Sequence, residues 1–200
     1  MAKRWGVGVN LDRCIGCYAC ITACKQENNV SLGVFFNRVF KIGPRGKIPK
    51  VEFHYIYRMC MHCERPPCLE GCPEGAISKR EDGIVLLERD KCSGCEECIK
   101  ACPYGVFSFN SELKVVEKCN FCHHRIDVGK EPACINACVA EVFTFGDLSD
   151  SKSIVSEYLT KGDAILPLSQ LSTGPSICYR ARSDFSREEL SVQPFLQRWT

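Results

Sequence analysis

The sequence predicts an α+β fold in which one small module is nested in another and an extended arm follows at the C-terminus. Two observations support this prediction. Cysteines recur in four runs of related spacing, so the chain has the character of a repeat. Short β-like segments and hairpin signals lie between the runs, so strands should alternate with the cysteine loops. With 200 residues, the chain is long enough for one domain or two small ones.

Sixteen of the 17 cysteines fall into four runs of four. The runs consist of Cys14, Cys17, Cys20 and Cys24; Cys60, Cys63, Cys68 and Cys72; Cys92, Cys95, Cys98 and Cys102; and Cys119, Cys122, Cys134 and Cys138. The spacing C-x2-C-x2-C-x3-C, found in the first and third runs, lets three sulfurs hold one cubane while the fourth reaches a neighbouring cluster. The sequence therefore predicts four [4Fe-4S] clusters. Cys178 stands outside the runs and is expected to be an ordinary buried or free thiol.

Zinc, disulfides and haem are the alternatives for so many cysteines. Structural zinc usually takes two separated C-x2-C pairs, and three cysteines at i, i+3 and i+6 do not supply that pattern. Disulfides are typical of short secreted chains, but the cysteine total is odd and no signal peptide is visible. The sequence from Cys119 to His123 matches the C-x2-C-H pattern of haem attachment. A covalent haem would consume two ligands of the fourth run and leave Cys134 and Cys138 stranded, so clusters are favoured.

Four β-like segments lead into the four runs. They span residues 6–11, 51–57, 84–87 and 114–116. Two hairpins are also expected. One joins residues 76–79 to residues 84–87 through the Asp82-Gly83 pair, and the other joins residues 106–109 to residues 114–116. The strands should therefore lead the backbone into the cysteine loops.

The middle two runs have the order of a two-cluster bacterial ferredoxin. Residues 56–109 contain a run, a proline, a hairpin, a second run and a second proline. In such ferredoxins the last cysteine of each run ligates the other cluster. This rule assigns Cys60, Cys63, Cys68 and Cys102 to one cluster (cluster C), and Cys72, Cys92, Cys95 and Cys98 to another (cluster D).

The two outer runs are then left to pair with each other. By the same exchange, Cys14, Cys17, Cys20 and Cys138 form cluster A, and Cys24, Cys119, Cys122 and Cys134 form cluster B. The predicted domains are an outer module of residues 1–55 and 110–148, an inner module of residues 56–109, and a short helix with a partner-docking tail at residues 149–200. The rival scheme pairs the first run with the second and the third with the fourth, which would break the ferredoxin-like middle.

Several segments in and around the runs resemble one protein family. They are Cys24-Lys25-Gln26-Glu27-Asn28-Asn29, Cys60-Met61-His62-Cys63 with Pro66-Pro67-Cys68, Lys79-Arg80-Glu81-Asp82-Gly83-Ile84-Val85, Cys102-Pro103-Tyr104-Gly105, Glu117-Lys118-Cys119-Asn120-Phe121-Cys122, Gly129-Lys130-Glu131-Pro132-Ala133-Cys134 and Phe145-Gly146-Asp147-Leu148. From about Val7 to Leu148 the chain resembles the four-cluster iron-sulfur electron-transfer subunit of dimethyl-sulfoxide-reductase-type molybdopterin oxidoreductases, such as the β-subunits of polysulfide and thiosulfate reductases. One position departs from the family pattern, because Cys138 is followed by Val139 where proline is usual.

The resemblance implies a subunit that relays single electrons and has no catalytic residue of its own. It also implies a large catalytic partner that holds molybdenum or tungsten in a pterin cofactor. In many relatives a membrane subunit that exchanges electrons with quinone completes the complex. The alternative function is that of a free polyferredoxin, a diffusible electron carrier. A carrier has no use for the ligand-free residues after Leu148, so a docked subunit is favoured.

Two residues next to ligands are candidates for tuning the cluster potentials. His62 lies inside the second run, and Lys118 directly precedes Cys119. The simpler interpretation, a partly exposed loop histidine and a solvated lysine, is favoured. The adjacent His123 and His124 are expected at the surface rather than at a shared metal site.

Charge and composition narrow the range of possible partners for the chain. The formal charge is +2, and sixteen thiolates with four oxidised cores of about 2+ each would bring it to about −6. The Lys3-Arg4 pair is the only basic pair near the N-terminus, so nucleic acid is not expected as a partner. No signal peptide or transmembrane segment is visible. The expected location is the cytoplasm, or the periplasm if a partner carries the export signal.

The residues after Leu148 are expected to form a short helix and then an arm. The helix should span residues 151–160, with Asp150 or Ser151 as its cap and Gly162 beyond its end. Prolines and scattered apolar residues follow, so the arm gains little by folding on itself. We expect it to lie on the catalytic partner, and a disordered terminus is the alternative.

Overall fold

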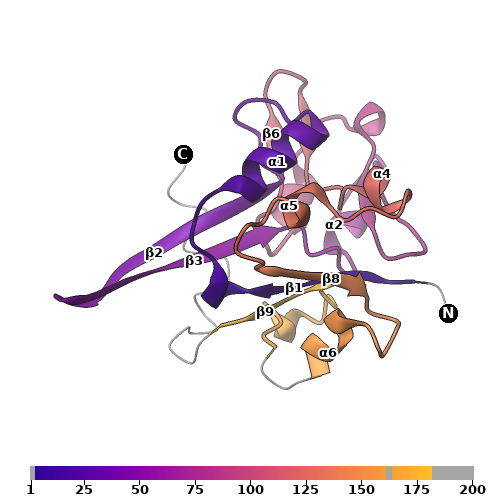
Figure 1. Cartoon of the computed structure of the whole chain (residues 1–200). Helices are drawn as coiled ribbons and strands as arrows, with labels where there is room; N and C mark the ends of the chain where they lie inside the picture. Colours follow the sequence, from indigo (N-terminus) through magenta and orange to yellow (C-terminus); the bar gives the residue numbers. More distant parts are fainter. Residues whose placement is uncertain (1–2, 161–163, 182–200) are drawn as a thin grey trace.

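The computed structural model describes residues 3–160 and 164–181 and has the α+β character that the sequence predicts. Strands and short helices alternate along the chain (Figure 1). The strands are β1 Trp5–Asn10, β2 Asn37–Lys47, β3 Lys50–Met59, β4 Ile77–Lys79, β5 Val85–Leu87, β6 Ser108–Asn110, β7 Val115–Glu117, β8 Phe143–Asp147 and β9 Ile177–Arg180. The α-helices are α1 Ala19–Asn28, α2 Pro67–Glu70, α3 Glu97–Ala101, α4 His123–Ile126, α5 Ala133–Asn136 and α6 Ile154–Thr160, and the 3-10 turns are Leu11–Arg13, Arg89–Lys91 and Ser169–Leu171.

A three-stranded sheet joins distant parts of the chain. Its strand order is β8-β1-β9, with β8 antiparallel and β9 parallel to β1. Val7 lies opposite both Phe145 and Ile177. Val7 and Ile177 are fully buried because helix α6 and the cysteine-rich body cover the two faces of the sheet. The N-terminal strand is therefore fixed by segments that follow it by well over one hundred residues.

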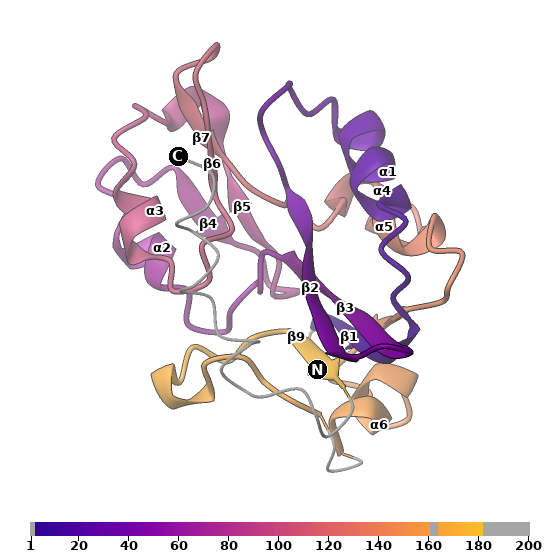
Figure 2. The ribbon, with the colours of Figure 1, turned by 90° about the vertical axis from the view of Figure 1, so that its left-hand side faces the viewer.

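The helices that carry the cysteine runs lie in two groups. Figure 2 shows α2 and α3 with the hairpins β4–β5 and β6–β7 on one side, and α1, α4 and α5 on the other. Contacts join α1 to α5 and α2 to α3. Helices from the first and fourth runs therefore pack together, as do helices from the second and third runs.

The two hairpins predicted from turn signals are confirmed. β4 pairs with β5 so that Ile77 faces Leu87, and β6 pairs with β7 so that Phe109 faces Val116. Gly83 has φ +85°, a conformation that the Asp-Gly signal anticipates. Strand β6 begins two residues later than expected.

The cysteine loops of the first and third runs share one backbone geometry. Gly16 and Gly94, which hold the same position in their runs, have φ of 66° and 74°. Tyr18 and Glu96 also match in position, and each has a left-handed conformation just before its helix, at φ of 61° and 62°. Because non-glycine residues seldom adopt positive φ, this repetition shows that the loops are built to one design.

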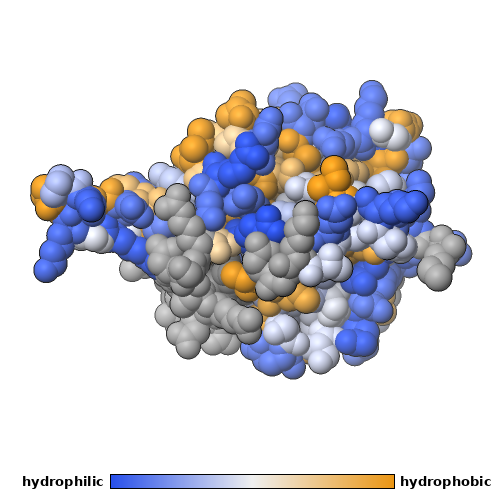
Figure 3. All heavy atoms as spheres, turned by 60° about the horizontal axis from the view of Figure 1, so that its bottom comes forward, coloured by the Kyte–Doolittle hydropathy of each residue, from blue (hydrophilic) through white to orange (hydrophobic). Residues whose placement is uncertain are grey.

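The long hairpin β2–β3 is a feature that the sequence did not predict in full. It projects from the body (Figure 1), and Figure 3 shows hydrophilic and hydrophobic residues side by side on the projection. Only residues 51–57 were expected as strand. Gly43, Pro44 and Gly46 gave β2 the composition of a turn, but the strand accommodates them at a register shift between Ile42 and Arg45.

The segment that was expected to be an extended arm is partly folded into the body. Helix α6 begins at Ile154, three residues later than expected, and strand β9 follows. Ile177, Cys178 and Tyr179 are all buried, at 0%, 1% and 1% exposure. The arm prediction is therefore wrong for residues 164–181, because three consecutive apolar side chains fill the space beside β1. Residues 182–200, the rest of the predicted docking tail, lie outside the described residues.

In the part of the chain that the structure describes, no helix is both long and apolar enough to cross a membrane.

Candidate iron-sulfur centres

Cysteines of the first and fourth runs line one cavity. Cys14, Cys17, Cys20 and Cys138 surround it. Burial raises the pKa of Cys14, and the nearby thiols of Cys138 and Cys17 raise it further. Cys14 and Cys17 come from the loop before α1 and Cys20 from α1 itself, whereas Cys138 follows α5, more than one hundred residues later. Their meeting follows from the packing of α1 on α5.

Cysteines of the second and third runs line another cavity. Cys60, Cys63, Cys68 and Cys102 surround it. Burial, and then the Cys60 thiol, raises the pKa of Cys63 to about 12. Proline and aromatic side chains complete the wall; they are Pro66, Pro67, Pro103, Tyr104 and Phe107. This wall excludes water from the sulfurs.

The remaining eight run cysteines form two further groups. Asn28 donates from Nδ2 to the Sγ atoms of Cys24 and Cys122, at 3.7 and 3.5 Å. Burial, and then the thiols of Cys134 and Cys122, raises the pKa of Cys24. In the other group, burial raises the pKa of Cys98 to about 11, with contributions from Cys72, Cys92 and Cys95. Each group combines cysteines from two different runs.

The chemistry of these thiol groups fits a cluster better than zinc or disulfides. All 17 cysteines are free thiols. Among the described residues, no group of three or more His, Cys, Asp or Glu side chains is close enough to hold a single metal ion. Thiols that raise one another's pKa need a cationic core before they can all ionise, and the larger [4Fe-4S] core supplies it.

Several hydrogen bonds to sulfur were not predictable from the spacing. The backbone N–H groups of Val116, Phe121 and Val142 donate to the Sγ atoms of Cys92, Cys119 and Cys138, at 3.4, 3.3 and 3.4 Å. Strands β7 and β8 and the left-handed backbone at Phe121 position these donors. Donors of this kind stabilise negative charge on the sulfur and so help to set the reduction potential.

Tyr57 and Asn28 are further candidate tuning residues that the sequence analysis missed. The buried hydroxyl of Tyr57 accepts a hydrogen bond from Asn37 Nδ2 at 3.1 Å, and its own proton is shared between Met59 Sδ, at 3.6 Å, and the Cys134 thiol. Burial raises the pKa of Cys134 to about 11, and the Tyr57 hydrogen bond opposes this rise. Tyr57 comes from the long hairpin, whose course was not predicted, so its place beside a sulfur had no sequence signal. Asn28 lies in one of the segments that carry the family resemblance.

His62 and Lys118 are both buried, so the expectation of a partly exposed histidine and a solvated lysine is wrong. His62 is 1% exposed and Lys118 is 4% exposed. The His62 ring stacks on Phe121 at 4.5 Å, and its Nδ1 accepts a hydrogen bond from the Val85 N–H at 3.0 Å. Burial, and then the Lys118 charge, lowers the pKa of His62 well below its ordinary value. The histidine is therefore neutral at physiological pH.

The residues that were expected to have no ligand role lie as predicted. Cys178 is buried away from the four groups, and its thiol lies 3.7 Å from the Val7 carbonyl oxygen. His124 lies 2.9 Å from Glu27, and His123 lies 3.7 Å from Asp127. Each histidine thus faces its own carboxylate near the surface.

The fold and the four thiol groups define a ferredoxin-type iron-sulfur protein. The 4Fe-4S dicluster domain family matches residues 51–148, and the 4Fe-4S binding domain family matches residues 11–28. An iron-sulfur subunit assigned to dimethyl sulfoxide reductase in Halobacterium salinarum is 40% identical over 205 residues, which cover 88% of this chain and 78% of the relative. A polysulfide reductase subunit of Wolinella succinogenes is 39% identical, covering 88% and 94%. The arsenate respiratory reductase iron-sulfur subunit ArrB of a Shewanella species is 33% identical, covering 88% and 95%.

The protein belongs to the family of iron-sulfur electron-transfer subunits of dimethyl-sulfoxide-reductase-type oxidoreductases. It carries [4Fe-4S] clusters, and its sixteen run cysteines fit four of them. Its function is to relay electrons within a reductase complex, and a free carrier is not favoured.

Proposed function

We propose that the four clusters are held by ligand sets that exchange one cysteine between paired runs. The sets are Cys14, Cys17, Cys20 and Cys138 for cluster A; Cys24, Cys119, Cys122 and Cys134 for cluster B; Cys60, Cys63, Cys68 and Cys102 for cluster C; and Cys72, Cys92, Cys95 and Cys98 for cluster D. The observation that supports this most directly is the cavity shared by Cys14 and Cys138, from opposite ends of the cysteine-rich region. Asn28, which donates to both Cys24 and Cys122, supports the exchange for cluster B.

The ligand sets correspond to an inner ferredoxin-like module of residues 56–109, nested in an outer module of residues 1–55 and 110–148. The packing of α2 on α3 and of α1 on α5 supports this division. A structure of the holo-protein provides the test. Ligation of one cluster by both Cys24 and Cys60 would instead favour sequential pairing of the runs.

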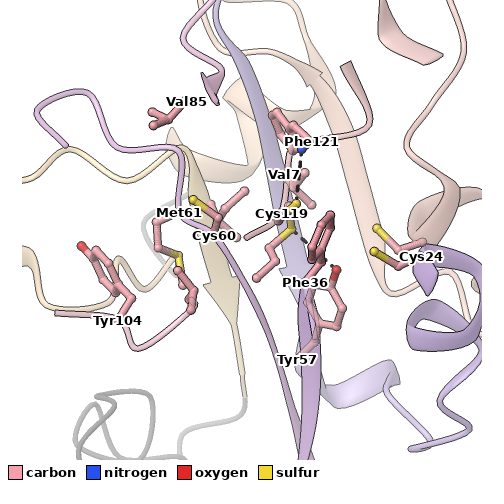
Figure 4. Packing of buried hydrophobic residues seen from close by; sticks show 14 of the residues in the cluster. Val7, Cys24, Phe36, Tyr57, Cys60, Met61, Val85, Tyr104, Cys119 and Phe121 are labelled. Carbon is pink, nitrogen blue, oxygen red and sulfur yellow. Dashed lines mark hydrogen bonds between the residues drawn. The ribbon is translucent and has the colours of Figure 1, made fainter. Parts of the chain in front are cut away.

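The four sites follow one another in the order A, B, C, D. The thiol of Cys20, from set A, interacts electrostatically with Cys134 of set B. Cys119 of set B interacts in the same way with Cys60 of set C. Figure 4 shows Cys24, Cys119 and Cys60 along one line through the core. Each bound cluster supplies a site for one electron, and the protein sets the spacing and the exclusion of water.

The relay has two exposed ends. Cys17 of set A and Cys95 of set D are the exposed cysteines, whereas the ligands of sets B and C are buried or partly buried. The surroundings of the ends differ, because Ile15 and Tyr18 are exposed next to Cys17, whereas Glu96 and Glu97 follow Cys95. Electrons should enter at one end and leave at the other, which requires a partner at each.

We further propose that one partner is a large catalytic subunit with molybdenum or tungsten in a pterin cofactor, and that a membrane quinone-reactive subunit can serve the other end. Support comes from the relatives, which are subunits of dimethyl sulfoxide, polysulfide and arsenate reductases. Purification of the native complex with metal analysis tests this proposal. Recovery of the chain without a large partner, or with a partner that contains neither metal, would count against it.

A further inference from the structure

Within residues 3–160 and 164–181, Lys118 is a buried cation without a carboxylate partner. Its Nζ atom donates to the carbonyl oxygens of Val85 and Cys119, the latter at 3.0 Å. Among the described residues these two carbonyls are its only hydrogen-bond partners. The neighbouring Glu117 is engaged elsewhere, because it pairs with Arg89 and accepts a hydrogen bond from Asn110. Burying an ammonium costs free energy unless an anion compensates its charge, so we expect an anion close to Lys118.

The anions that can compensate Lys118 belong to two cluster sites. Cys119, of set B, follows Lys118 directly and interacts with Cys60 of set C. Burial and the Cys60 thiol raise the pKa of Cys68, and the Lys118 charge opposes this rise. The ammonium therefore contacts the backbone of Cys119, from set B, and acts on the Cys68 thiol, from set C.

The surrounding residues hold Lys118 in this position. Val85 accepts from the ammonium through its carbonyl oxygen and donates from its N–H to His62 Nδ1. His62 in turn stacks on Phe121, which follows Cys119 by two residues. Strand β5 of the inner module is thus tied to the fourth cysteine run of the outer module by the lysine and the histidine.

Two other basic residues hold the same position before a run but have a different environment. Arg13 precedes Cys14, and its side chain is 50% exposed and paired with Glu141 at 2.7 Å. Lys91 precedes Cys92, and its side chain is 56% exposed and paired with Glu88 at 2.8 Å. Solvent and a carboxylate neutralise both of these charges. Lys118 has neither, so its field acts on the clusters.

We propose that Lys118 is a fixed positive charge shared by clusters B and C, which raises the reduction potentials of both and makes the junction between the modules the preferred resting place of an electron. Reduction adds one negative charge to a cluster, and a cation at close range in a water-poor interior stabilises that charge. The ammonium also lessens the repulsion between electrons on adjacent clusters. This inference rests on the proposed ligand sets.

The test replaces Lys118 in the cluster-loaded full chain and follows the cluster signals by potentiometric titration with paramagnetic resonance. Lys118→Met removes the charge and keeps the length of the side chain. Two of the four clusters should become at least tenfold harder to reduce, a shift of about 59 mV to lower potential for a one-electron step. The other two should not change. Lys91→Met is the matched control, and it should leave all four potentials unchanged.

Two further variants keep the test decisive. Lys118→Arg retains the charge, so its potentials should stay near those of the wild type. If Lys118→Met loses iron, Lys118→Gln retains a donor for the Val85 carbonyl and takes its place. Unchanged potentials in an iron-replete Met or Gln variant would overturn the proposal, as would a tenfold loss in the Arg variant. Cys119→Ser and Cys60→Ser identify the signals of clusters B and C, so an error in the ligand sets would be recognised separately.

Discussion

At the scale of single residues, hydrogen-bond donors to the cysteine sulfurs set the charge environment of the clusters. These donors lie outside the cysteine runs or between the cysteines of a run. Backbone N–H groups donate to Cys92, Cys119 and Cys138 among others, and the side chains of Asn28, Tyr57 and Thr173 reach further sulfurs. Each donor favours the more negative state of its cluster. The potentials should therefore respond to substitutions that leave every ligand in place.

Tyr57→Phe should lower the potential of the cluster that contains Cys134. The substitution removes the hydroxyl hydrogen bond and keeps the ring that packs edge-on against Phe143 at 4.7 Å. A hydrogen bond worth about 1 kcal/mol corresponds to roughly 40 mV for one electron. Potentiometric titration measures the shift. Tyr104→Phe is a useful comparison, because the Tyr104 hydroxyl bonds Thr173, which in turn bonds Cys63 of a different proposed set, so the potential of the cluster that contains Cys134 should not change. An equal shift in both variants would contradict a direct effect on Cys134.

Cys178 should be unreactive in the folded protein and dispensable for iron binding. Burial raises the pKa of its thiol to about 12. A raised pKa stabilises the fold while the thiol is protonated, so the contribution is complete below about pH 9 and is lost as the pH rises towards 12. Cys178→Ala should keep the full iron content, and native protein should resist iodoacetamide at this site at pH 8. Loss of iron in this variant, measured against Cys68→Ala, would show that Cys178 has a ligand role.

Residue type and sequence position indicated the candidate ligands but not their environment. The spacing alone was enough to group the sixteen cysteines into runs. Arg13, Lys91 and Lys118 could not be distinguished, since each is a basic residue directly before a cysteine. Their exposure depends on strands that approach from elsewhere in the chain, and β5 covers Lys118 alone. The tuning residues therefore required the tertiary structure.

At the scale of elements, tight packing around β1 restricts which side chains the strand can carry. A methyl group added to Gly8 would lie 2.8 Å from the ring of Tyr158 in α6, closer than carbon atoms can approach. Gly8 therefore allows α6 to lie directly on the strand. The short hairpins were predictable from local turn chemistry, whereas β9 was not, because its partner lies at the other end of the chain.

Gly8→Val should destabilise the protein by about 1–3 kcal/mol, because the larger side chain must displace α6. The half-life of cluster absorbance at elevated temperature is a suitable measure, since a protein with bound clusters does not unfold in two states. Adding Tyr158→Ala to Gly8→Val should recover part of the loss relative to Tyr158→Ala alone. If the two substitutions are simply additive, the close contact does not explain the effect.

Truncation after Ala181 is the appropriate test of the proposed docking tail. This cut leaves β9 and the central sheet in place, whereas a cut after Gly174 would remove β9 and its buried side chains. The chain truncated after Ala181 should keep its clusters and bind the catalytic partner more weakly. Co-purification measures the binding. The chain truncated after Gly174 is the comparison, and it should lose its clusters as well as its binding to the partner. Undiminished complex assembly by the Ala181 truncation would reject the docking role.

At the scale of the whole molecule, the clusters and the fold depend on each other. Each proposed set joins two runs, so clusters A and B tie the first run to the fourth, and clusters C and D tie the second run to the third. Without the cores, the thiols of a folded chain would be buried and protonated, as their raised pKa values indicate. Binding of the cores must therefore release protons and assemble the structure at the same time.

Removal of the clusters should unfold most of the chain, and their reassembly should be favoured by higher pH. Chelation of iron under anaerobic conditions is expected to reduce the far-UV circular dichroism signal together with the cluster absorbance. Because ligands must lose protons that their raised pKa values retain, apparent cluster affinity should increase between pH 7 and pH 9. Dichroism that persists after complete iron loss would show that the protein fold stands without its clusters.

The three-stranded sheet β8-β1-β9 also determines the order in which parts of the chain can fold during synthesis. Strand β1 is made first, but its neighbours β8 and β9 end at Asp147 and Arg180. A growing chain has every proposed ligand of clusters C and D once Cys102 has emerged, whereas cluster A must wait for Cys138 and the sheet for Arg180. If translation stops between Cys102 and Cys138, the inner module can already bind clusters C and D. The outer module then lacks Cys138 and strands β8 and β9, so it can neither bind cluster A nor form its sheet. Cofactor delivery in the cell should then proceed from the middle of the chain outwards.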